Sequence, residues 1–215
     1  MKSNAVTQKT YRALLLIDLQ NDFVEGGALS VSDGLSVIDV ANRLIPCFKH
    51  VIATQDWHPG DHQSFASQHP ELAVGDQFLL DGLTQTVWPD HCVQDSHGAA
   101  FVAGLSQAEI TQIFRKGTNK QIDSYSGFFD NGHRHSSGLR EYLRQSGIEH
   151  LFAMGLATDY CVRATVMDAI AEGFRVTLVV DGCRGVDLRT GDVERSINEM
   201  KQAGADMAFS NEIQK

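Results

Sequence analysis

Residues 151–173 read LFAMGLATDYCVRATVMDAIAEG, which is typical of a buried strand followed directly by a helix. Residues 151–156 form an apolar run without period-two alternation, as expected for a parallel strand that is covered on both faces. From Val162 onward the apolar residues fall on one helical face, and Gly173 marks the end of that helix. A strand that turns at once into a helix is the repeating unit of α/β folds.

The position of Cys161 makes it a candidate nucleophile. With Thr158 or Asp159 as the helix cap, Cys161 lies in the first helical turn. The free backbone N–H groups and the positive end of the helix dipole favour a thiolate there, which lowers the pKa of a cysteine. The same N–H groups could hold an oxyanion. The alternative is a buried and inert cysteine, which is the commoner state of a lone thiol.

Length and composition indicate one globular domain. The chain has 215 residues, 42% hydrophobic and 21% charged, with no Pro/Gly/Ser-rich spacer and no repeat, so we predict a single domain over residues 1–215. A net charge of −9 without a basic cluster argues against a nucleic-acid partner. The polar residues 1–10 and the lack of a long apolar stretch predict neither signal peptide nor membrane anchor, and hence a cytoplasmic protein. The cysteines lack CxxC spacing, so we expect four free thiols: Cys47, Cys92, Cys161 and Cys183.

Strands alternate with helices along the chain. Short apolar runs predict strands at residues 13–17, 51–54, 113–115, 151–156, 174–180 and 207–209. Helical spacing and end signals predict helices at residues 33–48, 137–145, 162–173 and 192–202. Residues 58–108 have poor periodicity, so they form either a functional loop or a missed element. The pattern predicts an α/β three-layer sandwich, with a mostly parallel six-stranded sheet and helices on both faces.

Ionisable side chains follow four of the predicted strands. They are Asp18 after the first strand, Asp56 and His58 after the second, Lys116 after the third and Cys161 beyond the fourth. Ligands of open parallel sheets bind in the crevice beyond the carboxyl ends of the strands. We therefore expect all these groups to converge on one rim of the sheet.

Asp18, Lys116 and Cys161 form the first expected set. A carboxylate close to a thiol can take its proton, and a nearby ammonium stabilises the resulting thiolate. Together they would make a nucleophile for acyl transfer. The alternative is a buried Asp–Lys pair that only satisfies its own charges.

Asp56, His58 and His91 form the second expected set, with His62 as a spare candidate. Asp56 and His58 are two residues apart, so in extended backbone their side chains leave the same face. With His91 from the long loop they give two imidazoles and one carboxylate, which suit zinc, iron or manganese with open positions. Such pairs also arise by chance, and a histidine is more often a surface or core residue than a ligand.

Four loop aromatics, which could stack on a flat ring or pack into the core, lie near the expected crevice: Phe23, Trp88, Tyr125 and Phe128.

Seven segments resemble, in order, the motifs of the nicotinamidases within the larger group of isochorismatase-like cysteine hydrolases. They are LLLIDLQNDFVEGGAL, QDWHPGDHQSFASQHP, VWPDHCVQ, FRKGTN, DSYSGFFDNG, GLATDYCVRATVMDA and DGCRGV. The resemblance runs from about residue 13 to beyond residue 185. It implies a six-stranded parallel sheet between helices, and an amidase of NAD salvage that converts nicotinamide to nicotinate and ammonia through a cysteine thioester.

The resemblance also implies roles for the first set. Asp18 would be the base, Cys161 the nucleophile, and Lys116 would stabilise the thiolate and the transition state. The oxyanion donors of the family correspond to the backbone N–H groups of Ala157 and Cys161, beside a cis peptide bond at Leu156–Ala157.

The second set and the aromatic residues receive roles in the same way. Asp56, His58 and His91 match metal ligands and would hold one divalent ion, zinc first, with iron or manganese as alternatives. That ion would hold the pyridine nitrogen so that the amide faces the sulfur. The candidates for the substrate pocket are Phe23, Trp88 and Tyr125. No role follows for His62, His133 or His135, and the sequence leaves open a monomer or a homodimer.

Other functions remain possible. Amidohydrolases that act on ureido or carbamoyl groups share the Asp–Lys–Cys set but lack the metal set, and isochorismatases proper lack the cysteine, so the two sets together favour the nicotinamidases. A metallohydrolase that attacks with metal-bound hydroxide would leave Cys161 structural. A binding protein without catalysis is disfavoured because every catalytic position is filled, and it would bind nicotinamide without releasing ammonia.

Overall fold

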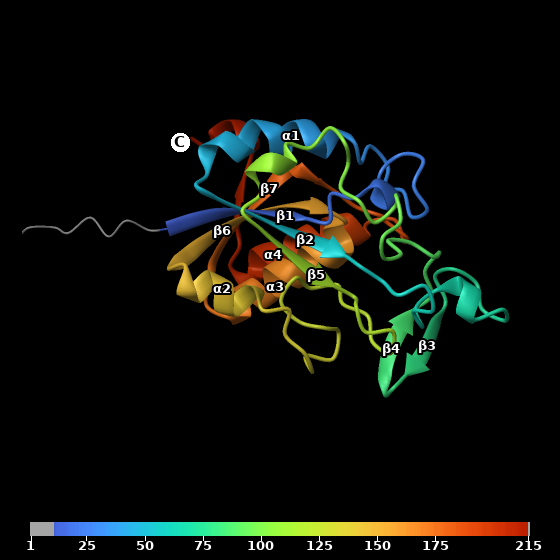
Figure 1. Ribbon diagram of the computed structural model, residues 1–215. Coiled ribbons are helices and arrows are strands. Elements are labelled where there is room, and N and C mark those ends of the chain that lie inside the picture. Colours follow the sequence, from blue (N-terminus) through green and yellow to red (C-terminus); the bar gives the residue numbers. More distant parts are fainter. Residues whose placement is uncertain (1–10, 215) are drawn as a thin grey trace, which may run out of the picture.

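The chain folds around one wholly parallel six-stranded sheet with the order β5-β2-β1-β6-β7-β8 (Figure 1). The computed structural model describes residues 11–214. The strands of this sheet are β1 (Tyr11–Ile17), β2 (His50–Asp56), β5 (Gln112–Lys116), β6 (Ile148–Leu156), β7 (Arg175–Arg184) and β8 (Asp206–Ala208). The predicted fold class, a three-layer α/β sandwich, is confirmed.

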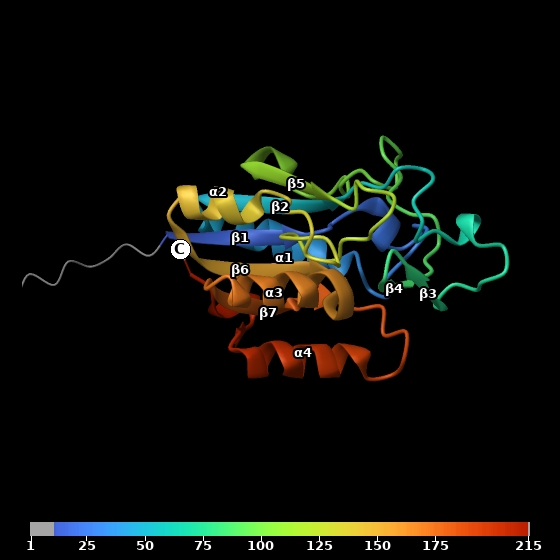
Figure 2. The same cartoon turned by 90° about the horizontal axis from the view of Figure 1, so that it is seen from below.

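Helices cover both faces of the sheet. They are α1 (Ser36–Leu44), α2 (Leu139–Gln145), α3 (Arg163–Ala171) and α4 (Asp192–Ala203). Helix α1 lies on one face, and α2, α3 and α4 lie on the other (Figure 1). The view from below shows α4 running alongside α3 (Figure 2). Because β1 lies in the middle of the sheet with both faces covered, residues 13–17 are fully buried.

The strand order creates the crevice that was expected from the sequence. From β1 the chain continues to β2 on one side, whereas β6 pairs with the other side of β1. Connections that leave a sheet in opposite directions open a crevice at the carboxyl ends of the two strands. Asp18 follows β1 and Cys161 lies just beyond β6, so the topology itself brings these residues to one place.

Several element boundaries differ from the prediction. The first helix ends at Leu44, and a short 3₁₀ helix, Ile45–Cys47, follows it. The α-helix cannot extend further because Pro46 has no N–H for a helical hydrogen bond. Strand β7 does not end at the predicted turn, Asp181 and Gly182. It runs on to Arg184 with a register shift opposite β6, so an irregularity in the strand replaces the turn.

The long segment after β2 contains a hairpin that the periodicity did not predict. Its strands are β3 (Gln77–Leu80) and β4 (Leu83–Thr86), which form a separate two-stranded sheet beyond the carboxyl ends of the main strands (Figure 1). Asp81 and Gly82 connect them with φ values of 50° and 80°. An Asp-Gly pair is a strong signal for such a tight turn, but the two strands are too short to show alternation.

The remaining sequence predictions have mixed outcomes. All four cysteines are free thiols, as predicted. No helix of the described residues is long and apolar enough to span a membrane. Residues 1–10, from which we predicted the lack of a signal peptide, lie outside the described residues. The assignment of residues 1–215 to a single domain stays a prediction.

Replacing Gly155 by alanine is expected to destabilise the protein strongly. Gly155 lies in β6 at φ 135°, and a Cβ there would come within 2.0 Å of the Ile17 carbonyl oxygen of β1. We expect a loss of about 3 kcal/mol or more in the free energy of unfolding, measured by urea denaturation. Gly173 is a matched control because it also has a positive φ, 86°, but no atom lies within 4 Å of its Cβ position. Equal losses for Gly155→Ala and Gly173→Ala would disprove the steric explanation.

Candidate active site

The Lys116 ammonium is at the centre of a buried polar cluster. Its Nζ donates hydrogen bonds to Asp56 Oδ1 at 2.6 Å, to the Ser124 carbonyl oxygen at 2.9 Å and to Cys161 Sγ at 3.3 Å. An ammonium has three N–H donors, so these three partners use all of them. Asp18 Oδ2 also lies 2.9 Å from Nζ as an ion pair. The structure therefore brings together the first set of residues that was expected from the sequence.

The Asp18 carboxylate has one bonded and one free oxygen. Asp18 follows β1 directly and adopts φ 52°, which turns the chain out of the sheet. Oδ1 accepts a hydrogen bond of 2.6 Å from the Thr54 hydroxyl. Oδ2 is buried and has no hydrogen-bond partner. Asp18 and Cys161 can present side-chain atoms within 4.8 Å of each other.

The turn that carries Cys161 differs from the expected helix start. Residues Thr158–Val162 form a π-helical turn, and α3 begins only at Arg163. The N-cap of this turn is Ala157, so the predicted caps Thr158 and Asp159 lie inside the turn. The Asp159 carboxylate instead accepts hydrogen bonds from the backbone N–H groups of residues 186 and 187, which come from a distant loop. The Leu156–Ala157 peptide bond is cis, as the resemblance implied.

The expected low pKa of Cys161 is not found. Burial raises the pKa of this thiol well above its ordinary value, although the Lys116 ammonium acts in the opposite direction. The Asp18 and Asp56 carboxylates add to the rise. Burial also raises the pKa of the Asp18 carboxyl, again against the effect of Lys116. Burial thus outweighs the opposing effect of the Lys116 ammonium on this thiol.

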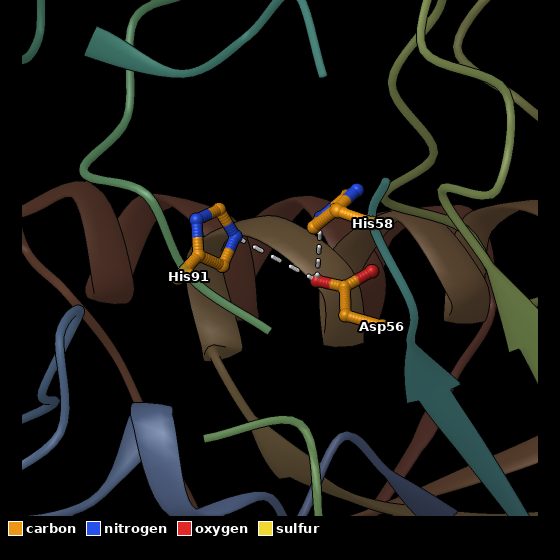
Figure 3. Close-up of side chains that lie close together, drawn as sticks. All are labelled: Asp56, His58 and His91. Atoms are coloured by element: carbon orange, nitrogen blue, oxygen red, sulfur yellow. Dashed lines mark ion pairs between the residues drawn. The ribbon is translucent and has the colours of Figure 1, made fainter. Parts of the chain in front are cut away.

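Asp56, His58 and His91 converge in a second cluster beside the first (Figure 3). Asp56 Oδ2 lies 3.7 Å from His58 Nε2 and 3.9 Å from His91 Nε2. Asp56 is the last residue of β2, and His58 follows it by two residues, as the sequence suggested. The three side chains are buried. They therefore form a compact group of one carboxylate and two imidazoles.

The hydrogen bonds of the two histidines fit a metal site. His58 Nδ1 lies 2.9 Å from the Gly117 carbonyl oxygen, and His91 Nδ1 lies 2.7 Å from the Pro89 carbonyl oxygen. A carbonyl only accepts, so each Nδ1 carries the proton and each Nε2 keeps a lone pair. His58 Nε2 is buried without any hydrogen-bond partner. A divalent cation between the two Nε2 atoms and the carboxylate would satisfy these atoms.

His62 lies next to this group. Its ring is 4.4 Å from the ring of His58, and its Nδ1 lies 2.8 Å from the Ser64 hydroxyl. His58, His62 and Asp123 together form a further group of potential ligands. The spare candidate therefore lies close to the metal group. His133 Nε2 instead lies 3.4 Å from Asp168 Oδ1, and His135 Nδ1 lies 2.9 Å from Asp130 Oδ2.

A cavity with aromatic walls opens beside the sulfur. Its lining includes Phe23, Leu29, Asp56, Trp88, His91, Asp123, Tyr125, Ala157, Tyr160, Cys161 and Val186. The Trp88 indole N–H donates to the Tyr125 hydroxyl at 3.0 Å, which holds these two rings in place. The three predicted substrate residues therefore line one cavity with Cys161 and with two members of the metal group, Asp56 and His91. Phe128, the fourth aromatic residue, is fully buried against Phe174 and does not line it.

One short segment forms the wall between this cavity and a second one. Asp123 and Tyr125 line the aromatic cavity, whereas Ser124 and Ser126 line a polar cavity on the other side. The side chains thus alternate between the two cavities. Because the Ser124 carbonyl accepts a hydrogen bond from Lys116, this wall is attached directly to the polar cluster.

Comparison with known proteins assigns the chain to a family. A model of the isochorismatase domain matches residues 12–212. The chain belongs to the isochorismatase family. The nicotinamidase of Escherichia coli (strain K12) is 54% identical over 199 residues, which cover 90% of this chain and 92% of that protein.

Solved structures of the isochorismatase family agree. A structure of an Acinetobacter baumanii nicotinamidase and pyrazinamidase is 40% identical, with a TM-score of 0.91 over 95% of this chain and 99% of that one. The pyrazinamidase of Pyrococcus horikoshii, solved in complex with zinc, is 36% identical, with a TM-score of 0.76 over 92% and 98% of the two chains.

Some residues of this candidate site were not predicted from the sequence. Thr54 contacts Asp18, and Asp123 lines the cavity. The signal for Thr54 was its place two residues before Asp56 on the same strand face. Asp123 lies in the quoted segment DSYSGFFDNG, but nothing in its spacing indicated that its side chain enters the cavity.

Proposed function

We propose that this member of the isochorismatase family is a nicotinamide amidohydrolase, which converts nicotinamide to nicotinate and ammonia in NAD salvage. The observation that carries the proposal is the hydrogen bond from Lys116 Nζ to the sulfur of Cys161, a residue that lines a cavity with aromatic walls. The 54% identity with the Escherichia coli nicotinamidase supports the same reaction. A cytoplasmic location and a monomeric or homodimeric state belong to the proposal.

In the proposed reaction, Asp18 Oδ2 takes the thiol proton as Cys161 Sγ attacks the carboxamide carbon. The ammonium of Lys116 stabilises the sulfur as it becomes negative. The backbone N–H groups of Ala157 and Cys161 hold the oxyanion of the tetrahedral intermediate. Burial raises the pKa of the Asp18 carboxyl, which makes its carboxylate a stronger proton acceptor. The raised pKa of Cys161 opposes the transfer, and the Lys116 ammonium offsets part of that rise.

The rest of the reaction has two stages, loss of ammonia and hydrolysis of the thioester. Asp18 gives its proton to the amide nitrogen, the C–N bond breaks, and ammonia leaves a thioester on Cys161. Asp18 next takes a proton from a water molecule, which attacks the thioester carbon. The C–S bond breaks, Asp18 returns its proton to the sulfur, and nicotinic acid leaves as nicotinate after it gives its remaining proton to the released ammonia. Atoms and charges balance, and the enzyme is regenerated.

The aromatic walls are proposed to hold the pyridine ring. Phe23 and Trp88 would sandwich it, and Tyr125 fixes Trp88 through the hydrogen bond to its indole. A flat ring held in this way places its carboxamide near Cys161. Because the cavity is lined mostly by apolar atoms, water is kept from the ring during the reaction.

Asp56, His58 and His91 are proposed to hold one divalent metal ion. Their free Nε2 atoms and carboxylate oxygen suit zinc, and the Pyrococcus horikoshii pyrazinamidase was solved with zinc. When bound, the ion would act as a Lewis acid that holds the pyridine nitrogen, directly or through its own shell. The protein residues carry out the proton transfers.

Release of ammonia from nicotinamide tests the function. Purified protein should produce ammonia and nicotinate in equal amounts, measured by a coupled ammonia assay and by chromatography. Benzamide, which has the same amide but no ring nitrogen, should react much more slowly if the metal holds that nitrogen. Protein that binds nicotinamide but releases no ammonia would instead be a binding protein.

Removal of the metal is expected to lower the rate by roughly 100-fold, because the ring loses its orientation. The rate and the metal content should be measured after dialysis against a chelator, and again after zinc is added. His91→Ala should lower both the metal content and the rate, whereas His97→Ala, at an exposed histidine, should change neither. Full activity of metal-free protein would disprove the role of the ion.

A further inference from the structure

Thr54 lies beside the proposed base on the last part of β2. Its Cα pairs with that of Ile17, the residue before Asp18. Since Thr54 precedes Asp56 by two residues in a strand, both side chains leave the same face of the sheet. Thr54 is fully buried, and its hydroxyl donates to Asp18 Oδ1 at 2.6 Å. The hydroxyl therefore contacts the base but lies outside the lining of the substrate cavity.

The two oxygens of Asp18 have different surroundings. Oδ1 is bonded to Thr54, whereas Oδ2 has no hydrogen bond even though the Lys116 Nζ lies 2.9 Å away. The three donors of Lys116 are used by other partners, so Oδ2 remains available to a proton. Rotation of a carboxyl group about its last torsion is soft, so a hydrogen bond to one oxygen decides where the other points.

We propose that Thr54 is a positioning residue, which holds Asp18 Oδ1 so that Oδ2 is the oxygen that exchanges protons with Cys161. This inference rests on the proposed function, because it assigns the orientation of the base in that reaction. Without the Thr54 hydroxyl, the Asp18 carboxylate can rotate, so that either Oδ1 or Oδ2 lies beside Lys116. The base is then correctly oriented for only part of the time.

The surroundings of Thr54 allow its hydroxyl and its methyl group to be tested separately. The methyl group packs beneath Gly127, where a Cβ would come within 2.6 Å of Thr54 Cγ2. Valine keeps this packing but has no hydroxyl, and serine keeps the hydroxyl but lacks the methyl group. A difference between Thr54→Val and Thr54→Ser therefore reports on the hydrogen bond and not on the packing.

Thr165 offers a matched control. It is also fully buried, and its hydroxyl accepts a hydrogen bond of 2.9 Å from the Gly127 backbone N–H. This hydrogen bond does not involve Asp18. Thr165→Val thus removes a buried hydroxyl from the same region without touching the base.

The test compares steady-state hydrolysis of nicotinamide by these variants with thermal unfolding, metal content and the inhibition constant of nicotinate. We expect Thr54→Val to lower kcat roughly 10- to 100-fold, as misplaced reacting groups do, with unchanged nicotinate inhibition and metal content. Thr54→Ser should stay within about threefold of the parent, well short of the loss for a misoriented base. Thr165→Val should lose thermal stability but keep kcat.

Three results would contradict the proposed role of Thr54. Thr54→Val as fast as the parent, Thr54→Ser as slow as Thr54→Val, or Thr165→Val equally slow would each overturn the role of the Thr54 hydroxyl. A parent protein that releases no ammonia would overturn the proposed function and this role with it. An active parent with an equally active Thr54→Val variant overturns the role of Thr54 alone.

Discussion

Replacing Cys161 by alanine is expected to lower the rate of nicotinamide hydrolysis by roughly 10⁴-fold or more, because the nucleophile is lost. The sulfur is buried and accepts a hydrogen bond from Lys116. The methyl side chain of alanine has no atom that can attack the carboxamide in its place. Nicotinate should still bind, since the aromatic walls and the metal group are unchanged. The rate is measured by ammonia release, and binding by calorimetry.

Cys183 provides the control for this variant. It is as buried as Cys161, at 6% exposure, and its thiol donates to the Val179 carbonyl oxygen, away from the cavity. Cys183→Ala should keep the parent rate. If Cys161→Ala keeps turnover as well, the nucleophile is a water molecule, and the protein is a metallohydrolase in which the cysteine is structural. Trapping of a nicotinoyl adduct on residue 161 by mass spectrometry would separate the two mechanisms directly.

The convergence of the site could be predicted because it follows from topology. Parallel strands place their carboxyl ends on one rim, so residues that end or directly follow β1, β2 and β5 meet there whatever the details of packing. Asp18, Asp56 and Lys116 each occupy such a position. Cys161 lies just beyond β6 for the same reason. The spacing of Asp56 and His58 likewise followed from the geometry of an extended chain.

Other features depend on contacts between distant segments and could not be predicted from local patterns. Asp159 looks like a helix cap, but residues 186 and 187 use its carboxylate, and the turn becomes π-helical. The pKa of Cys161 depends on how deeply the completed fold buries the sulfur. The hydrogen bond between Thr54 and Asp18 joins neighbouring strands, and only their register reveals it.

Asp18→Asn is expected to have the second largest effect, a fall in the hydrolysis rate of roughly 10³-fold. Asparagine keeps the shape and still offers an oxygen to the Thr54 hydroxyl, but an amide cannot take a proton from the thiol. The same substitution removes a negative charge that raises the pKa of Cys161. The thiolate should therefore form at lower pH, and iodoacetamide should modify Cys161 faster than in the parent.

These opposite changes distinguish a proton acceptor from a purely electrostatic role. If Asp18 only adjusted the charge on the sulfur, a lower pKa of Cys161 would leave hydrolysis as fast as, or faster than, in the parent. Asp130→Asn is the control, because Asp130 is also a buried carboxylate but accepts hydrogen bonds from the backbone of residues 132 and 134. Asp130→Asn should change neither the rate of nicotinamide hydrolysis nor the rate of alkylation of Cys161. Faster alkylation with slower hydrolysis in Asp18→Asn alone would identify Asp18 as the group that moves the proton, since a thiolate without an acid to protonate the leaving nitrogen does not release ammonia.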